Sequence, residues 1–172
     1  MPKPYNFHEG VLLMELVCDA QGDAAPRLND VALTREQALA HHATLLGEVV
    51  RMLCAGIVHG DLSEFNILLA ADGPVIIDLP QAVDAAGNNH AQRMLLRDVN
   101  NLRDFFGRAA PELLATQHGP EIWDLFQRGV LSPGVKPTGR YERKSGAVDL
   151  GGVMREIDDA RAEEAARKLR MG

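Results

Sequence analysis

Two short segments carry side chains suited to one reaction. Residues 59–66 read His-Gly-Asp-Leu-Ser-Glu-Phe-Asn, and the apolar run 75–77 ends at Asp78. Phosphoryl transfer from a nucleotide needs a carboxylate that orients the attacking group, and an amide and a second carboxylate that hold Mg²⁺. Asp61, Asn66 and Asp78 supply these groups in that order. Taken singly, each is also an ordinary turn or strand-end residue.

The residues between Asn66 and Asp78 predict an element that brings these two side chains together. Apolar runs at 67–69 and 75–77 flank residues 70–74, which contain the turn-forming pair Asp-Gly. We expect a β-hairpin, because pairing of the two runs places Asn66 alongside Asp78. Both side chains then reach one Mg²⁺ ion, which prefers oxygen ligands.

Two further elements are predicted upstream of the loop. Thr34 and Gln37 have the spacing of a capping box, and apolar residues at helical spacing follow until Gly56, a plausible helix stop. A long amphipathic helix is therefore expected to lead straight into the loop. Before it, the apolar run 11–17 has the length of a strand, and a polar segment, 19–30, follows it.

The loop 59–66 and the sequence Ile-Asp-Leu-Pro-Gln at 77–81 together resemble the RIO family of atypical serine/threonine protein kinases and ATPases. That family has Ser-Glu before an aromatic residue and the Asn in its catalytic loop, and its metal loop is of the Ile-Asp-x-x-Gln kind. Residues 11–17 resemble the hinge strand that touches adenine, and residues 96–106 resemble the helix after the metal loop. The resemblance covers residues 2–107.

The resemblance implies an α+β fold, mainly helical, in the form of a protein-kinase-like carboxy-terminal lobe with a hinge strand and a small catalytic β-hairpin. We expect one domain over 1–172: hinge strand and exit loop in 1–30, catalytic lobe core in 31–107 and a helical carboxy-terminal extension in 108–172. The sequence contains neither a G-x-G-x-x-G nor a V-A-I-K pattern. The amino-terminal lobe, with its glycine-rich loop and phosphate-pairing lysine, is therefore expected to be missing.

The same resemblance implies ATP and Mg²⁺ as cofactors. Adenine would lie against the hinge, beside Met14, with its edge hydrogen-bonded to the backbone of Glu15 and Val17. Asp61 would orient the acceptor hydroxyl, and Asn66 with Asp78 would hold the metal. In RIO-type ATP hydrolysis the metal-loop aspartate becomes phosphorylated, and here that residue would be Asp78.

Four other residues have supporting roles by resemblance. His59 is expected to hold the loop by packing and hydrogen bonding rather than to act as a general base. Ser63 and Glu64 would lie near the phosphates or the substrate hydroxyl, with ordinary turn capping as the alternative. Asp98 would accept hydrogen bonds from the loop backbone, with a solvated helical acid as the alternative.

The implied function is ATP- and Mg-dependent phosphoryl transfer to protein serine or threonine, and a kinase and a conformational ATPase share this site. One alternative is a small-molecule phosphotransferase of the aminoglycoside or choline kinase type, which also carries H-G-D-x-x-x-x-N. The other is a non-catalytic, truncated lobe that serves as a binding module for a partner, such as a ribosomal precursor or a separately encoded amino-terminal lobe.

Composition limits the partners. The 172 residues, 46% of them hydrophobic, are enough for one core. A net charge of -6 argues against a broad nucleic-acid surface, while a local patch for a ribosome-related partner stays open. The sequence has no stretch of eighteen apolar residues and no secretory leader, so we expect a cytoplasmic protein without a membrane partner. An exposed hinge strand also predicts self-association.

Overall fold

The computed structural model describes residues 1–142, of which Met1–Tyr141 form one compact unit. The last part of the predicted extension, from residue 143 onward, lies outside the described residues. The described elements follow one another as β1 (Pro4–His8), β2 (Val11–Met14), η1 (Leu28–Asp30), α1 (Arg35–Cys54), β3 (Ile57–Val58), η2 (Glu64–Asn66), β4 (Ile67–Ala70), β5 (Gly73–Ile76), β6 (Val83–Asp84), α2 (Ala91–Phe106), η3 (Pro111–Ala115) and α3 (His118–Gln127).

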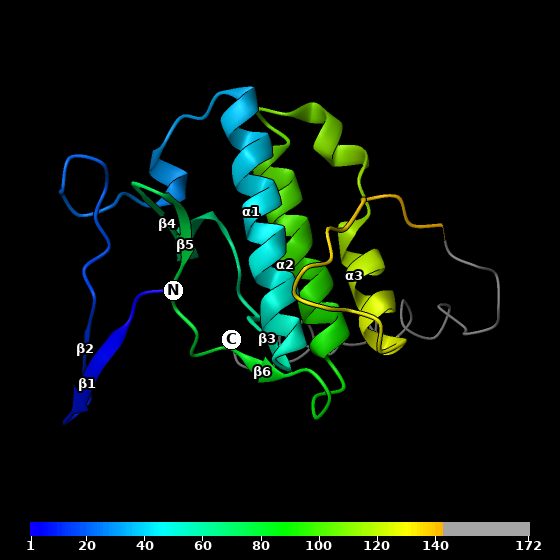
Figure 1. The fold of residues 1–172 in the computed structure, drawn as a ribbon, viewed down its shortest axis with the longest axis horizontal. Coiled ribbons are helices and arrows are strands. Elements are labelled where there is room, and N and C mark those ends of the chain that lie inside the picture. Colours follow the sequence, from blue (N-terminus) through cyan, green and yellow to red (C-terminus); the bar gives the residue numbers. More distant parts are fainter. Residues whose placement is uncertain (143–172) are drawn as a thin grey trace, which may run out of the picture. The chain divides into compact units, whose positions relative to one another are not determined.

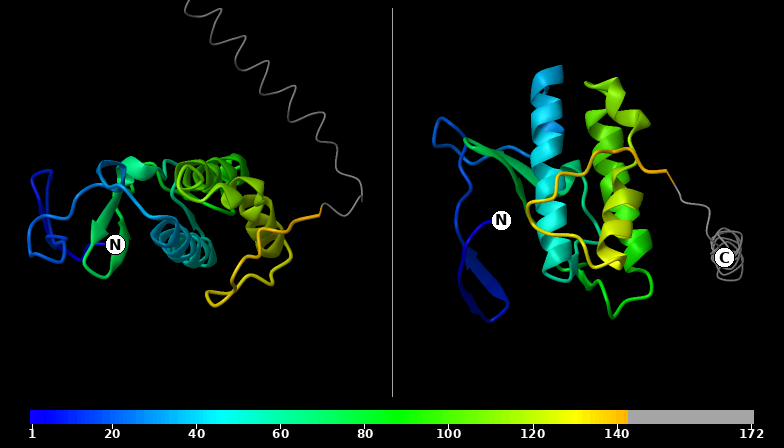
Figure 2. Two further views of the ribbon diagram at one scale, coloured as in Figure 1. Left: turned by 90° about the horizontal axis from the view of Figure 1, so that it is seen from above. Right: turned by 45° about the vertical axis from the view of Figure 1, so that its right-hand side comes forward.

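The core of this unit is helical. Helices α1 and α2 lie side by side, and α3 packs against α2 (Figures 1 and 2). The strands form antiparallel pairs, β1 with β2, β3 with β6 and β4 with β5. The fold is therefore α+β and mainly helical, as predicted. Its fully buried side chains come chiefly from the helices and include Leu45, Val50, Leu53, Leu95, Val99, Leu102, Phe106 and Ile122.

Helix α1 begins and ends as its sequence predicts. The Thr34 hydroxyl accepts a hydrogen bond from the Gln37 amide at 3.2 Å, and the Gln37 side chain accepts one from the Thr34 amide at 2.9 Å, which completes the capping box. After Cys54 the chain turns at Gly56, which has a φ of 79°. The Gly56 carbonyl then accepts from the Ala85 amide at 2.8 Å, and this bond ties the end of α1 to β6.

The hairpin β4–β5 is confirmed, with a tighter turn than expected. Ile67 pairs with Ile76, and Ala70 pairs with Gly73, so only Ala71 and Asp72 form the connection. Residues 73 and 74 belong to β5 rather than to the turn. Pro74 is tolerated there because, in residues 1–142, β5 pairs with β4 alone, so its missing N–H faces no second strand of the sheet.

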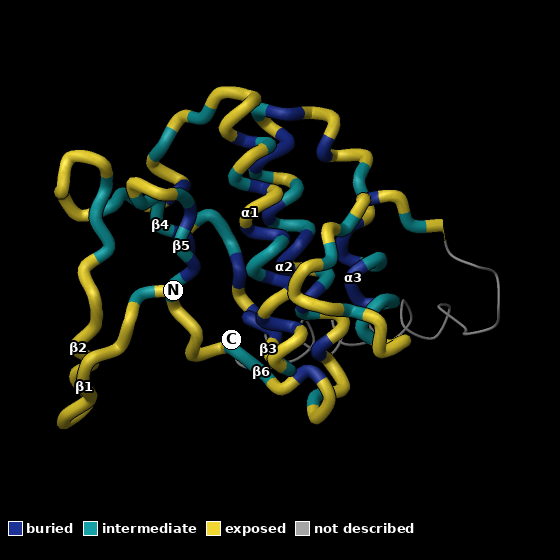
Figure 3. The backbone as a smooth tube through the Cα atoms, viewed as in Figure 1, coloured by how far each residue is buried: buried dark blue, intermediate teal, exposed yellow. Residues whose placement is uncertain are grey.

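A second hairpin, β1–β2, was only half predicted. The expected strand over 11–17 ends at Met14, and it pairs with β1, which the sequence pattern did not indicate. Glu9 and Gly10 both have positive φ, at 48° and 81°, as a two-residue turn of this hand requires. All nine strand residues are exposed, and the hairpin stands apart from the helices (Figures 1 and 3).

The described part of the carboxy-terminal extension, residues 108–142, contains two short helices. Within the described residues, η3 and α3 are its helices, and residues 128–142 contain none. Those residues are held instead by the Glu121 carboxylate, which accepts hydrogen bonds from the Thr138 and Gly139 amides at 2.9 and 2.7 Å. None of the helices in residues 1–142 has the length and apolar character needed to cross a membrane.

Candidate active site

The loop 59–66 connects β3 to β4 and depends on a glycine. Gly60 has a φ of 82°, a conformation that side chains disfavour. A Cβ atom at this position would lie 2.7 Å from the Gln81 carbonyl oxygen and 2.7 Å from the Met94 Cε atom. Glycine therefore lets the loop lie directly against the segment that follows Asp78.

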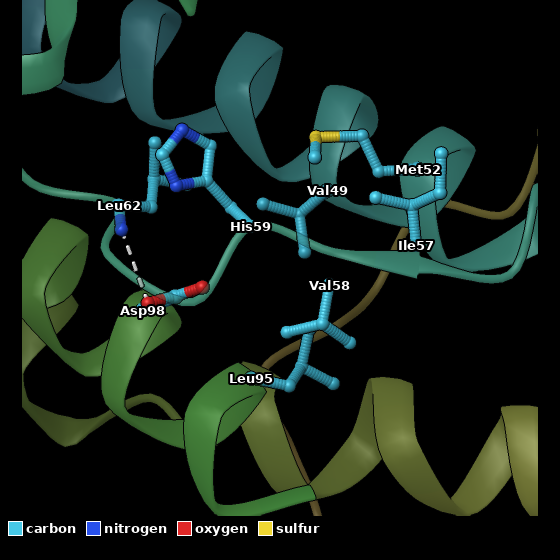
Figure 4. Close-up of a pocket in the computed structure, with 8 residues that line it drawn as sticks. All are labelled: Val49, Met52, Ile57, Val58, His59, Leu62, Leu95 and Asp98. Carbon is cyan, nitrogen blue, oxygen red and sulfur yellow. Dashed lines mark hydrogen bonds between the residues drawn. The ribbon is translucent and has the colours of Figure 1, made fainter. Parts of the chain in front are cut away.

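Asp98 of helix α2 anchors this loop through two hydrogen bonds. The Asp98 side chain is 1% exposed, and its two oxygens accept hydrogen bonds from the Gly60 amide at 2.8 Å and the Leu62 amide at 3.1 Å. Figure 4 shows the Leu62 amide directed at the carboxylate. Burial raises the pKa of Asp98, while the hydrogen bonds from the two amides and the charge of the Arg97 guanidinium act in the opposite direction. The hydrogen bonds expected for Asp98 are present.

Two neighbours of Asp98 also contact the loop, and the sequence analysis missed both. The Arg97 guanidinium donates to the Gly60 carbonyl, and the Asn101 side-chain amide donates to the Leu62 carbonyl at 3.0 Å. The signal in the sequence was their spacing, because residues four apart on a helix share a face. Nothing local indicated that this face would meet the loop.

His59 links the loop to the strand that ends before Asp78. Its Nε2 atom lies 3.0 Å from the Ile77 carbonyl oxygen, and its Nδ1 atom accepts a hydrogen bond from the Asp61 amide at 3.3 Å. An acceptor at Nδ1 requires a neutral ring with its proton on Nε2, which donates to the carbonyl. Both nitrogens of this buried ring are thus engaged in holding the loop.

Asn66, at the start of the hairpin, is bonded to Asp61 and to the residue before Asp78. The Asn66 side-chain amide donates to the Asp61 carbonyl at 2.8 Å and to the Asp61 carboxylate at 3.3 Å. The Asn66 backbone carbonyl accepts from the Ile77 amide at 3.0 Å, so the β4–β5 pairing continues to the residue before Asp78. Asp78 itself is exposed and has a φ of 66°, a left-handed conformation that a non-glycine residue adopts at a cost.

The donor set at this end of the hairpin fits Mg²⁺. Because the Asn66 nitrogen donates to Asp61, its side-chain oxygen is left as an acceptor for a cation, and Asp78 presents a carboxylate. Mg²⁺ commonly takes one or two protein oxygens and fills its octahedron with water and phosphate. In residues 1–142 no group of three or more His, Cys, Asp or Glu side chains is arranged to hold a metal ion.

Ser63 and Glu64 lie in the second half of the loop, at the start of η2. The Ser63 side chain makes no capping hydrogen bond to η2, and its backbone is extended. The Glu64 carboxylate is 14% exposed and lies 3.8 Å from the Arg108 guanidinium. At this distance the ion pair orients Glu64 toward the carboxy-terminal end of α2.

The expected adenine-binding residues lie outside this loop network. Met14 ends β2, the Glu15 amide donates to the Lys3 carbonyl at 2.8 Å, and the Val17 carbonyl accepts from the Ala25 amide at 2.9 Å. Within the described part of the chain, no backbone hydrogen bond uses the Glu15 carbonyl or the Val17 amide. The structure thus leaves one acceptor and one donor at this edge, and no hydrogen bond in residues 1–142 joins residues 14–17 to the loop.

The helical core, the small hairpin and the loop held by α2 are compatible with a kinase-like α+β fragment. The family known as the RIO domain matches residues 1–118, and the chain belongs to this family. The recognition made from the loop sequences is therefore confirmed.

Several relatives within the family carry kinase names. The chain is 40% identical over 108 residues to the RIO-type serine/threonine-protein kinase Rio1 of Haloferax volcanii, a match that covers 63% of this chain and 36% of that protein. It is 33% identical over 132 residues to a probable serine/threonine-protein kinase RIO1 homolog of Encephalitozoon cuniculi, with 76% and 32% covered. It is 35% identical over 108 residues to the human serine/threonine-protein kinase RIO1, with 62% and 19% covered. The chain thus spans about a third or less of the length of these relatives.

Proposed function

We propose that this chain supplies the catalytic carboxy-terminal lobe of a RIO-type serine/threonine protein kinase or ATPase that uses ATP and Mg²⁺, with a cytoplasmic location. The observation that carries the proposal is the position of Asn66, whose side chain contacts Asp61 and whose carbonyl pairs with the residue before Asp78. Asn66 is thereby bonded both to Asp61 and to the residue before Asp78. The kinase names of the relatives support the same reaction.

Each residue then has one task. Asp61 orients the acceptor hydroxyl and accepts its hydrogen bond, and Asn66 and Asp78 hold the magnesium ion. When bound, Mg²⁺ neutralises charge on the phosphates. His59 and Asp98 act through the loop backbone, so catalysis rests on positioning and on charge stabilisation.

Adenine recognition is assigned to the hinge. The Glu15 carbonyl and the Val17 amide are the two groups that would hydrogen-bond the edge of the base, with Met14 beside it. A protein kinase and a conformational ATPase would use the same site. They differ in the acceptor, which is a protein hydroxyl in the first and the Asp78 carboxylate in the second.

Titration calorimetry of ATP into the chain, with and without Mg²⁺, tests this proposal. We expect binding that depends on Mg²⁺ and that weakens at least about tenfold in Asp78→Ala, because one of two protein ligands to the metal is lost. Asp72→Ala is the matched control, since Asp72 is an exposed aspartate at the opposite end of the same hairpin. A folded chain that binds ATP equally well with and without Mg²⁺, or not at all, would contradict the proposal.

The family match argues against the small-molecule phosphotransferase, whereas the exposed hairpin favours a role in binding. Val11, Leu12, Leu13 and Met14 are between 44% and 69% exposed, and in the described residues β2 pairs on one edge only. An apolar strand with a free edge is a site for strand addition. We propose that this hairpin docks a protein substrate or a ribosome-related partner, and that at high concentration it pairs with a second copy.

Light scattering at increasing concentration measures this self-association. A charged side chain on an edge strand opposes strand addition, so Leu13→Lys is expected to return the chain to a monomer. Val130→Lys is the control, because Val130 is 54% exposed and lies outside the hairpin. A wild-type chain that stays monomeric at high concentration would rule out the pairing, and an equal effect of the two substitutions would place the contact elsewhere.

A further inference from the structure

Gly60 and Leu62 flank Asp61, and the backbone amide and carbonyl of each are hydrogen-bonded to side chains of α2. Asp98 accepts from the amides of Gly60 and Leu62, as described above. The carbonyls of the same two residues accept from Arg97 and Asn101. Three side chains of one helix face therefore bind two amides and two carbonyls, and Asp61 lies between these anchored residues.

Helix α2 is a firm base for these contacts. Its buried face also carries Leu95, Val99 and Leu102, each no more than 2% exposed, into the core between the helices. Side chains that project from such a helix keep their positions, since moving them would disturb the packed core. Because the packed core fixes the helix, the loop residues that are bonded to the helix are held in place as well.

These contacts matter because the residue before Asp61 is a glycine. Gly60 carries no side chain and has a positive φ, so its peptide groups rotate at little steric cost. The Asp61 side chain is exposed, and its carboxylate meets Asn66 at 3.3 Å. The position of that carboxylate therefore depends on the peptide groups on either side of it as well as on Asn66.

We infer that Arg97 and Asn101 are positioning residues for Asp61, which fix the carbonyl side of its two neighbours while Asp98 fixes the amide side. This inference rests on the proposed function, in which Asp61 orients the acceptor hydroxyl. Displacement of a catalytic group by about 1 Å is enough to cost about a hundredfold in rate, so both carbonyl contacts matter to the reaction.

Nuclear magnetic resonance of the full chain tests the inference without requiring turnover. The side-chain NH₂ resonances of Asn66 report the contact with Asp61, and amide hydrogen exchange reports the loop. In Arg97→Met and in Asn101→Leu we expect the Asn66 resonances to shift toward those of a free amide, and exchange at residues 60–62 to accelerate at least about tenfold. Arg97→Lys, which keeps a donor, is expected to restore the wild-type resonances.

The control is Arg103→Met, on the same helix, where the arginine pairs with Asp104 at 2.7 Å. It is expected to leave the Asn66 resonances and the exchange at 60–62 unchanged. Asn101→Leu removes only an uncharged donor, so it carries the test if Arg97→Met does not fold. Unchanged Asn66 resonances in a folded Asn101→Leu chain would overturn the inference. Failure of the proposed function is read separately, from the absence of Mg²⁺-dependent ATP binding by the wild-type chain.

Discussion

Replacing Asp98 by alanine is expected to lower the free energy of unfolding by about 3–5 kcal/mol. The substitution leaves the Gly60 and Leu62 amides without their acceptor at a site where the carboxylate is 1% exposed. Water is a poor replacement there, because the adjoining cavity is lined mostly by apolar side chains (Figure 4). Chemical denaturation at neutral pH measures the loss.

Two further variants, one at Asp104 on the same helix and one at position 98 itself, separate the causes of this loss of stability. Asp104→Ala removes an exposed carboxylate that pairs with Arg103, and it is expected to cost less than about 1 kcal/mol. Asp98→Asn keeps one acceptor oxygen, so it should fall between the wild type and the alanine variant. If Asp98→Ala and Asp104→Ala destabilise the chain equally, Asp98 does not anchor the loop.

The second large effect is a loss of stability in mild acid that originates at His42. This side chain is 2% exposed, and its ring packs edge-on against Phe106 at 5.7 Å and beside His118 at 5.3 Å between centroids. Within the described residues its Nε2 atom has no hydrogen-bond partner. Burial and the nearby His118 lower the pKa of His42 from 6.5 to about 4. Burial lowers the pKa of His118 as well, with Glu121 acting against it.

The sign of the effect follows from the protons bound in each state. Between pH 6.5 and about 4 the unfolded chain binds a proton at His42 that the folded chain does not bind. The free energy of unfolding therefore falls as the pH is lowered through this window, by about 3 kcal/mol at most, and this contribution levels off below it. The raised pKa of Asp98 acts in the opposite direction, since folding then favours its protonated form.

Denaturation curves recorded from pH 7.5 to pH 4 measure the slope, and the difference between wild type and His42→Phe isolates the contribution of His42. Phenylalanine keeps an aromatic ring against Phe106 and cannot take up a proton. His90→Gln is the control, because His90 is exposed and its replacement should leave the slope unchanged. Parallel slopes in the wild type and in His42→Phe would contradict the prediction.

Much of the site could be predicted because its signals are local. The capping box at Thr34, the stop at Gly56 and the apolar runs around Asp72 each act within a few residues, and each produced the element that it indicated. The order of loop, strand and turn in the sequence was enough to predict that Asn66 and Asp78 lie at the same end of the hairpin. The strand β1 escaped prediction, since residues 4–8 mix Pro, Asn and His with two aromatic residues and give no clear period.

The sequence by itself determined the family, the residues of the loop and the hairpin that aligns them. Only the tertiary structure decided how that loop is held, because Gly60 and Asp98 lie 38 residues apart in the chain. Contacts of this kind depend on which face of α2 turns toward the loop once the helices have packed. The same packing presses Gly60 against Gln81 and brings His42 to His118. Local sequence patterns predict the helices and strands. The packing of helices and strands that are distant in the sequence decides which of their side chains come into contact.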